Sequence, residues 1–121
     1  MNTRHENLLT DRLQILPEEI ECFIQAPSLE NETIQNMMAV TEYDYYKLLR
    51  LSKSNRNEFI NQELANSIGD YIQNIQIKQG SKLLFEGFDG IEYGTISKSV
   101  IIPEWFKEKY VPDTCMISNE W

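Results

Sequence analysis

The chain is 121 residues long and carries 19 acidic against 11 basic side chains, which gives a formal net charge of −8 and an isoelectric point near 4.6. This length is typical of a single domain that builds its core without disulfides or metals. The negative charge argues against direct binding to nucleic acid or anionic membranes and favours a basic partner, although acidity also serves solubility alone.

The first third of the chain spaces its apolar residues as a helix does. Four leucines recur at helical intervals over residues 8–16, which predicts a helix that ends before Pro17. Pro17 suits the first turn of a second helix, and Glu18 and Glu19 would then lie near its positive N-terminal end. Residues 30–40 show a weaker helical pattern.

Two further helices are predicted in the middle of the chain. Thr41 is suited to cap a helix over residues 42–52, whose basic side chains fall toward its negative C-terminal end. After a polar break, residues 58–75 place aliphatic and aromatic side chains at near-regular intervals of four. Gly69 within this segment disfavours the helix by about 1 kcal/mol.

The last third of the chain changes to a strand pattern. Two apolar runs, residues 83–88 and 91–96, flank Asp89 and Gly90, and this dipeptide between apolar runs is a strong signal for a β-hairpin. The other elements expected here are a strand at 100–102, a helix at 104–110 and a short strand at 115–117.

These elements predict an α+β fold, in which a helical N-terminal body of four to five helices packs on a small antiparallel sheet that contains the 83–96 hairpin. We expect one globular domain over residues 1–121, with residues 1–6 disordered. Neither a leader peptide nor an apolar run of the ~20 residues needed to cross a bilayer is apparent, so a cytoplasmic protein is expected. Cys22 and Cys115 are then expected to be free buried thiols, although one long-range disulfide is conceivable.

Residues suited to catalysis or metal binding are scarce. His5 is the single histidine, so neither a catalytic pair nor a cluster of metal ligands is indicated. Glu18, Glu19 and Glu21 could do general acid–base work if one were buried, but a helical first turn favours a solvated, structural role. Asp89 and Glu92 lack the further alternating acids of a calcium loop. We therefore expect no enzyme activity, no metal and no cofactor.

The segment Tyr43-Asp44-Tyr45-Tyr46 is the part of the sequence most typical of a binding surface. Tyrosine combines a rigid apolar ring with a hydrogen-bonding hydroxyl and is enriched at protein interfaces. Together with Glu42, this acidic and aromatic run could dock against a basic surface. The alternative is that two of the three tyrosines face the core while Asp44 caps a helix.

The acidic charge, the size, the run from Glu42 to Tyr46 and the lack of an active site resemble the small immunity proteins of bacterial toxin–immunity pairs, including those of contact-dependent growth inhibition. The resemblance is to the class as a whole. It implies a protein-binding antagonist that covers the active site of a basic nuclease toxin with acidic and aromatic residues. The residues predicted to bind the partner are Glu42, Tyr43, Asp44, Tyr45, Tyr46, Glu18, Glu19, Glu86, Asp89 and Glu92.

Two other functions fit the same features. A nucleic-acid mimic of phage or bacterial origin would carry carboxylates spaced like phosphates, but the middle third of the chain, residues 41–80, has five acids and five bases. A non-catalytic structural or adaptor domain would use its acidity only for solubility. An extended acidic stripe would favour the mimic, and salt-insensitive association would favour the adaptor.

Overall fold

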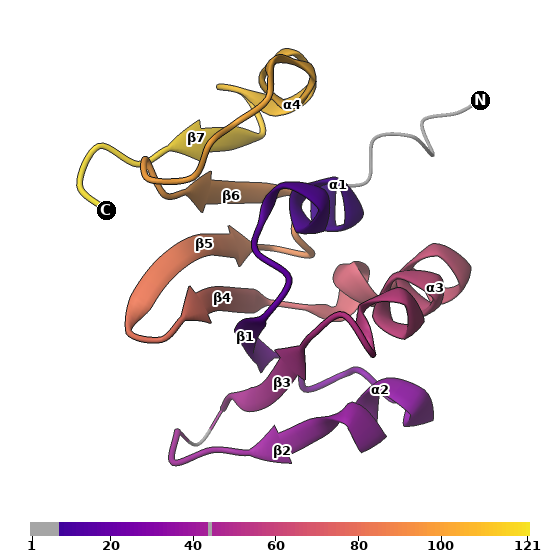
Figure 1. The fold of residues 1–121 in the computed structure, drawn as a ribbon. Helices are drawn as coiled ribbons and strands as arrows, with labels where there is room; N and C mark the ends of the chain where they lie inside the picture. The colour runs from indigo at the N-terminus through magenta and orange to yellow at the C-terminus, as the bar shows by residue number, and fades with distance from the viewer. Residues whose placement is uncertain (1–7, 44) are drawn as a thin grey trace.

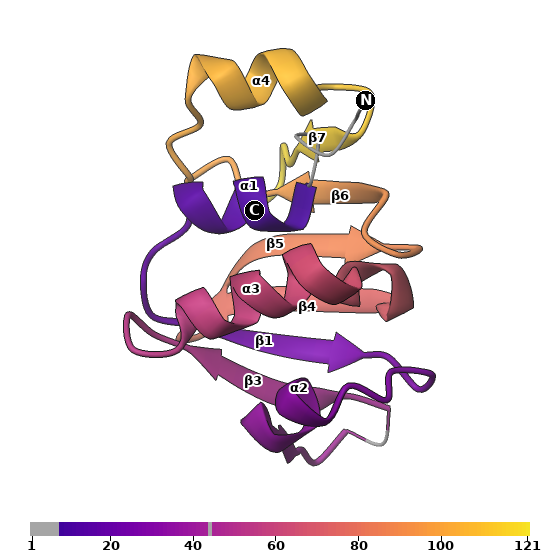
Figure 2. The same cartoon turned by 90° about the vertical axis from the view of Figure 1, so that its right-hand side faces the viewer.

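The computed structural model describes residues 8–43 and 45–121 of the chain. Its centre is a seven-stranded mixed sheet, with α1, α2 and α3 on one face and α4 beyond one edge (Figure 1, Figure 2). The prediction of a helical body on a small antiparallel sheet is therefore wrong, because the sheet dominates and the helices are short. The elements in chain order are α1 (Leu8–Ile15), β1 (Ile20–Gln25), α2 (Glu32–Met37), β2 (Met38–Val40), β3 (Lys47–Leu51), α3 (Arg56–Asn66), the 3₁₀ helix η1 (Ile68–Tyr71), β4 (Asn74–Gln79), β5 (Lys82–Phe88), β6 (Tyr93–Ile96), α4 (Glu104–Tyr110) and β7 (Cys115–Ile117).

The strands lie in the order β2-β3-β1-β4-β5-β6-β7. All neighbouring strands are antiparallel except β6 and β7, which are parallel. A register shift between Ile77 and Lys78 marks a bulge in the β4–β5 pair. The two edges of the sheet are therefore β2 and β7.

The segment that was predicted to form a second helix from Pro17 forms the strand β1 instead. Ile20, Cys22 and Ile24 are buried and the residues between them are half-buried, which is a period of two. The same segment also fits helical spacing through Ile20, Phe23 and Ile24, so the pattern alone does not distinguish a helix from a strand. Pairing to β3 on one side and β4 on the other requires extended backbone, and these tertiary contacts override the helical pattern.

The helix predicted over residues 42–52 is also wrong, because its second half is β3 with alternate leucines buried. The helix predicted over residues 58–75 is right only in its first part. α3 ends at Asn66, where Ser67 takes a left-handed conformation with φ 51°. η1 and then β4 follow, and the alternating isoleucines of β4 are buried.

Several predictions for the last third are confirmed. β5 and β6 form the expected hairpin, although β6 begins at Tyr93 rather than at residue 91; α4 covers residues 104–110, and residues 115–117 form β7. The hairpin turn holds Asp89 and Gly90 at positive φ, 53° and 74°. The strand expected at residues 100–102 is absent from the described structure, and Ile101 there is 90% exposed.

Both cysteines, Cys22 and Cys115, are buried and free, as predicted. The predictions for His5 and for residues 1–6 lie outside the described residues. Within residues 8–43 and 45–121, no helix is both long enough and apolar enough to cross a bilayer.

Helix α1 is tied to its neighbours at two points. The carboxylate of Asp11 accepts hydrogen bonds from Lys109 Nζ at 2.7 Å and from the Tyr110 hydroxyl at 2.6 Å, which links α1 to α4. The guanidinium of Arg56 donates to the carbonyl oxygens of Leu13 and Glu18 at 2.5 and 2.6 Å, which links α1 and the start of β1 to α3. α1 is thereby held on the helical face of the sheet (Figure 2).

Candidate protein-interaction surface

The face of the sheet opposite α1, α2 and α3 carries no helix within the described part of the chain (Figure 1). We call it the open face. Along each inner strand, side chains alternate between the open face and the buried side that faces the helices. Strand pairing aligns one residue of each strand across this face, namely Ala39, Leu48, Phe23, Gln76, Glu86, Thr95 and Met116 from β2 to β7. The row is apolar toward both edges and polar in its centre.

Residues 41–46, which we call the tyrosine loop, connect β2 to β3. The hydroxyl oxygen of Thr41 accepts a hydrogen bond from the Tyr43 N–H at 2.9 Å and donates one to the carbonyl oxygen of Tyr46 at 2.9 Å. Thr41 therefore organises this loop rather than capping a helix. Asp44, which was predicted to cap a helix or bind a partner, lies outside the described residues.

The three tyrosines of the loop are not buried in the core. Tyr43 is 53% exposed and Tyr45 is 76% exposed. The ring of Tyr43 stands edge-on to the ring of Phe23, with centroids 6.3 Å apart and an interplanar angle of 74°. The ammonium of Lys78 lies 5.1 Å from the centre of the same Phe23 ring. The loop thus places an aromatic pair at the border of the open face.

Tyr46 is joined to the centre of the open face by hydrogen bonds. Its hydroxyl donates to Asn74 Oδ1 at 2.7 Å, and Asn74 Nδ2 donates to Glu86 Oε2 at 3.1 Å. Partial burial, and after it the negative charge of Glu86, raise the pKa of Tyr46 above its ordinary value, so its hydroxyl is a donor at neutral pH. Two predicted residues from distant parts of the sequence are therefore linked by Asn74, for which the sequence carries no signal.

The remaining predicted acids do not all gather at one place. Glu42 is exposed in the tyrosine loop. Asp89 and Glu92 lie in the β5–β6 turn, at the same end of the sheet as that loop, but Glu92 lines a hollow on the helical side. Glu18 and Glu19 are exposed before β1, at the opposite end of the sheet. Of the predicted set, Glu86, Tyr43 and Tyr46 lie on the open face or contact it, whereas Tyr45 lines a hollow beside Gln35 of α2.

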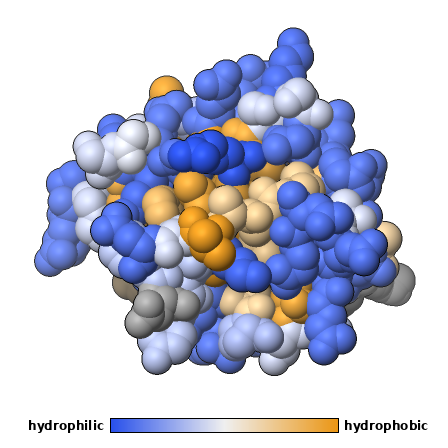
Figure 3. Space-filling view, turned by 90° about the horizontal axis from the view of Figure 1, so that it is seen from below, coloured by the Kyte–Doolittle hydropathy of each residue, from blue (hydrophilic) through white to orange (hydrophobic). Residues whose placement is uncertain are grey.

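The β2 edge is an apolar area that the sequence analysis missed. Seen from this edge, apolar side chains gather in the middle of the surface with polar side chains around them (Figure 3). β2 contributes Met38, Ala39 and Val40, and Val40 is 86% exposed. These residues were predicted as the end of a helix, since three uncharged residues after a helical pattern carry no strand signal of their own.

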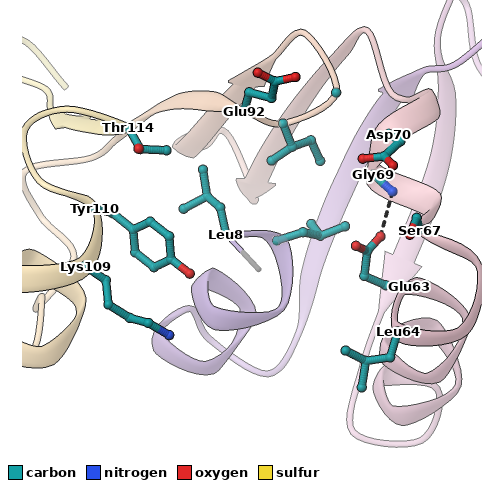
Figure 4. Close-up of a pocket in the computed structure, with 13 residues that line it drawn as sticks. Leu8, Glu63, Leu64, Ser67, Gly69, Asp70, Glu92, Lys109, Tyr110 and Thr114 are labelled. Atoms are coloured by element: carbon teal, nitrogen blue, oxygen red, sulfur yellow. Dashed lines mark hydrogen bonds between the residues drawn. The ribbon is translucent and has the colours of Figure 1, made fainter. Parts of the chain in front are cut away.

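A hollow of about 600 Å³ lies on the helical side, between α1, η1, the β5–β6 turn and the end of α4 (Figure 4). Its lining is largely polar and includes Asp70, Glu92 and Glu63. Glu63 is buried and accepts a hydrogen bond from the Gly69 N–H at 2.6 Å, as the dashed line in Figure 4 shows. Tyr110 likewise donates its hydroxyl proton to α1. The hollow is a polar junction between elements, unlike the mostly apolar pockets that bind small molecules.

The two thiols are poorly suited to nucleophilic chemistry. Burial raises the pKa of the Cys22 thiol to about 12 and that of the Cys115 thiol to about 11, so both keep their protons at neutral pH. Among the described residues, no group of three or more His, Cys, Asp and Glu side chains is placed to hold a metal ion.

No protein-family model matches the chain, and neither the curated proteins nor the solved structures gave a match. Function is therefore inferred from the open face, the tyrosine loop and the β2 edge.

Proposed function

We propose that this chain is a protein-binding antagonist that docks a basic protein on the open face and the tyrosine loop. The observation that carries the proposal is the aromatic pair of Tyr43 and Phe23, which stands edge to face at the border of a sheet face that no described helix covers. Exposed aromatic side chains beside a hydrogen-bonded polar network are typical of the anchors that dominate protein–protein binding energy.

The open face has the layout of an interface. Phe88 on β5 is 38% exposed and Tyr93 on β6 is 55% exposed, and strand pairing places them side by side. Phe88 also pairs with Asn74, so these rings border the network that joins Tyr46 to Glu86. A partner could bury the rings while the network offers hydrogen bonds in the centre.

The net negative charge of the chain favours a basic partner, because long-range electrostatic attraction would steer its approach. The net charge of −8 attracts a cationic protein, and Glu42 lies at one end of the sheet while Glu18 and Glu19 lie at the other. On the open face itself, Glu21 and Arg50 form a salt bridge at 3.2 Å. This pattern favours aromatic anchors with an acidic rim over nucleic-acid mimicry, which would need a continuous stripe of carboxylates.

A nuclease toxin is the partner class that fits this surface best. A nuclease that binds RNA or DNA presents a cationic cleft, because it must neutralise phosphates. An acidic protein with aromatic anchors would occlude that cleft by charge and shape, without any chemistry of its own. The function proposed is therefore that of an immunity protein, which protects a cell by covering the active site of a toxin.

The proposal is tested by titrating purified cationic nucleases, including any encoded beside this chain, and measuring the dissociation constant by calorimetry together with the residual nuclease activity. We expect nanomolar binding that abolishes activity, and a loss of affinity of at least about tenfold in Tyr43→Ala. Tyr71→Ala is the matched control, because Tyr71 is 47% exposed but belongs to η1 on the helical side. Equal losses in both variants, or none in Tyr43→Ala, would contradict docking on this face.

A further inference from the structure

The outer side of β2 has no strand partner among the described residues. β2 pairs with β3 alone, through Met38, Ala39 and Val40. None of these residues is charged and none is a proline, although charges and prolines are two of the features that protect a sheet edge against pairing with another chain. Val40 is 86% exposed, and Figure 3 shows apolar surface where this edge faces the viewer.

The other edge, β7, has α4 and the C-terminal tail as neighbours. α4 lies beyond it in Figure 2. The tail after β7 is tied back to the end of β6, because the Ser118 N–H donates to the carbonyl oxygen of Ile96 and the Lys98 N–H donates to that of Trp121, each at 2.8 Å. Both edge strands are short and uncharged, and Met116 on β7 is 61% exposed, so the two edges are distinguished by the charge of their surroundings.

The segment that carries β2 is acidic. Residues 30–46 contain four acidic residues and no basic one, and Glu30, Glu32 and Glu42 are exposed. The first basic residue after this segment is Lys47, whose ammonium donates a hydrogen bond to a glutamine of α2. These surroundings favour a cationic ligand. They disfavour a second copy of this chain, because two such edges would bring like charges together.

We propose that β2 receives an extended segment of the partner, rich in Lys or Arg, which adds to the sheet as an eighth strand. Backbone hydrogen bonds to the free side of β2 would supply affinity, and the acidic surroundings would select cationic side chains. The inference rests on the proposed function for the class of partner, but it concerns a different contact. Because β2 leads directly into the tyrosine loop, a strand added here and a body docked on the open face would form one continuous interface.

The first test uses two peptides and the unmodified chain. One peptide alternates valine and lysine, and the other has the same composition with a central proline that prevents strand pairing. Amide hydrogen exchange is followed by NMR. We expect the alternating peptide to slow exchange at one or more amides of residues 38–40 by at least about tenfold, and the proline peptide to leave them within about twofold. Equal protection by both peptides, or protection only elsewhere, would overturn strand addition.

The second test places a lysine on the edge. Val40→Lys is compared with Ile101→Lys, because both side chains are almost fully exposed, at 86% and 90%, and only Val40 lies in β2. We expect Val40→Lys to weaken binding of the alternating peptide by about tenfold and Ile101→Lys to change it by less than about twofold. Equal weakening would show that net charge alone governs binding and would overturn the proposal.

The two proposals can fail separately. If a basic nuclease binds with a dependence on Tyr43 but is indifferent to Val40→Lys, strand addition is wrong and the proposed function stands. If Val40→Lys weakens that binding and Tyr43→Ala does not, β2 is the binding surface and docking on the open face is wrong. Sedimentation that shows a dimer of the unmodified chain, lost in Val40→Lys, would assign the edge to a second copy and overturn the proposed strand addition.

Discussion

The guanidinium carbon of Arg12 lies 3.7 Å from the centre of the Phe85 ring in the core between α1 and the sheet. The ring in turn lies across the paired glycines Gly87 and Gly94, where an added Cβ would come within 2.9 Å and 2.3 Å of ring atoms. Both contacts help to set the distance between α1 and the sheet. They also explain why α1 packs on the strands of the 83–96 hairpin.

Replacing the Arg12 guanidinium with an apolar group should leave the fold intact. Arg12 is fully buried, none of its three side-chain nitrogens has a hydrogen-bond acceptor within the described chain, and burial lowers its pKa to about 10, so it is charged at neutral pH. Because a buried charge without hydrogen-bond acceptors is costly, we expect Arg12→Met to match or exceed the unmodified chain in stability. Arg12→Ala should lower the free energy of unfolding by about 2–4 kcal/mol through a cavity.

Urea unfolding of both variants checks this, with Arg50→Met as the exposed control. Arg50 forms a surface salt bridge and should contribute less than about 1 kcal/mol. A loss in Arg12→Met as large as in Arg12→Ala would show that the charge itself stabilises the core through the Phe85 ring.

Adding a methyl group at Gly94 should destabilise the sheet. The new Cβ would lie 2.3 Å from Cζ of Phe85, which is far inside contact distance. We expect Gly94→Ala to lower the free energy of unfolding by about 1–3 kcal/mol through overpacking. The double variant Gly94→Ala, Phe85→Leu should lose less than the sum of the single variants, because the smaller side chain relieves the clash. Additive losses in a double-mutant cycle would contradict this contact.

The two buried thiols should make the fold less stable at alkaline pH. In the unfolded chain they release protons near pH 9, whereas burial holds their pKa at about 12 for Cys22 and about 11 for Cys115 in the folded chain. The folded state then binds more protons, so the free energy of unfolding falls as pH rises above 9 and continues to fall toward the folded pKa values.

Between roughly pH 8 and pH 10 we expect the thiols to remove about 2–3 kcal/mol of stability. Urea unfolding at both pH values should show this loss in the unmodified chain, and a smaller loss in Cys22→Ala, Cys115→Ala, which has no thiols. Other groups that titrate in this range affect both proteins alike, so the difference between the two slopes of unfolding free energy against pH reports the thiols alone. Identical slopes in the two proteins would mean that the thiols are not protected from ionisation by the fold.

The link between α1 and α4 should contribute more than a surface ion pair. Asp11 accepts hydrogen bonds from Lys109 and Tyr110, and its side chain is 14% exposed. We expect Asp11→Asn to lower the free energy of unfolding by about 1–3 kcal/mol, because charge-assisted hydrogen bonds in a partly buried site are lost. Glu21→Gln, which breaks the exposed pair with Arg50, should cost less than about 1 kcal/mol. The opposite order in thermal unfolding would contradict this ranking.

Local turn chemistry predicted the hairpin of β5 and β6, but the long-range sheet could not be predicted in the same way. Asp89 and Gly90 take positive φ and adjoin apolar runs, so the signal and the structure lie in one short segment. β1, β3 and β4 acquire their conformation from strands distant in sequence. Their short apolar runs fit both the helical and the strand period, and the sequence does not show which partner is available.

The candidate site was predictable in its residue types and not in its geometry. Tyr43, Tyr45 and Tyr46 stood out because tyrosine is common at interfaces, and two of them, Tyr43 and Tyr46, contact residues of the open face. The open face itself follows from the order of seven strands, which local patterns do not encode. Glu18 and Glu19 were predicted to bind the same partner as the tyrosines because they are acidic. They lie before β1, at the opposite end of that strand from the tyrosine loop.

The measurement that tests the central claim most directly is NMR chemical-shift mapping of this chain during titration with a cationic nuclease that it binds. We predict that the largest perturbations fall on the open face and its border, at Phe23, Tyr43 and Glu86. Tyr71 on the helical side should remain within the scatter of unperturbed residues. Perturbations centred instead on the helical hollow around Asp70 and Glu92 would contradict the proposal that the uncovered sheet face binds the partner.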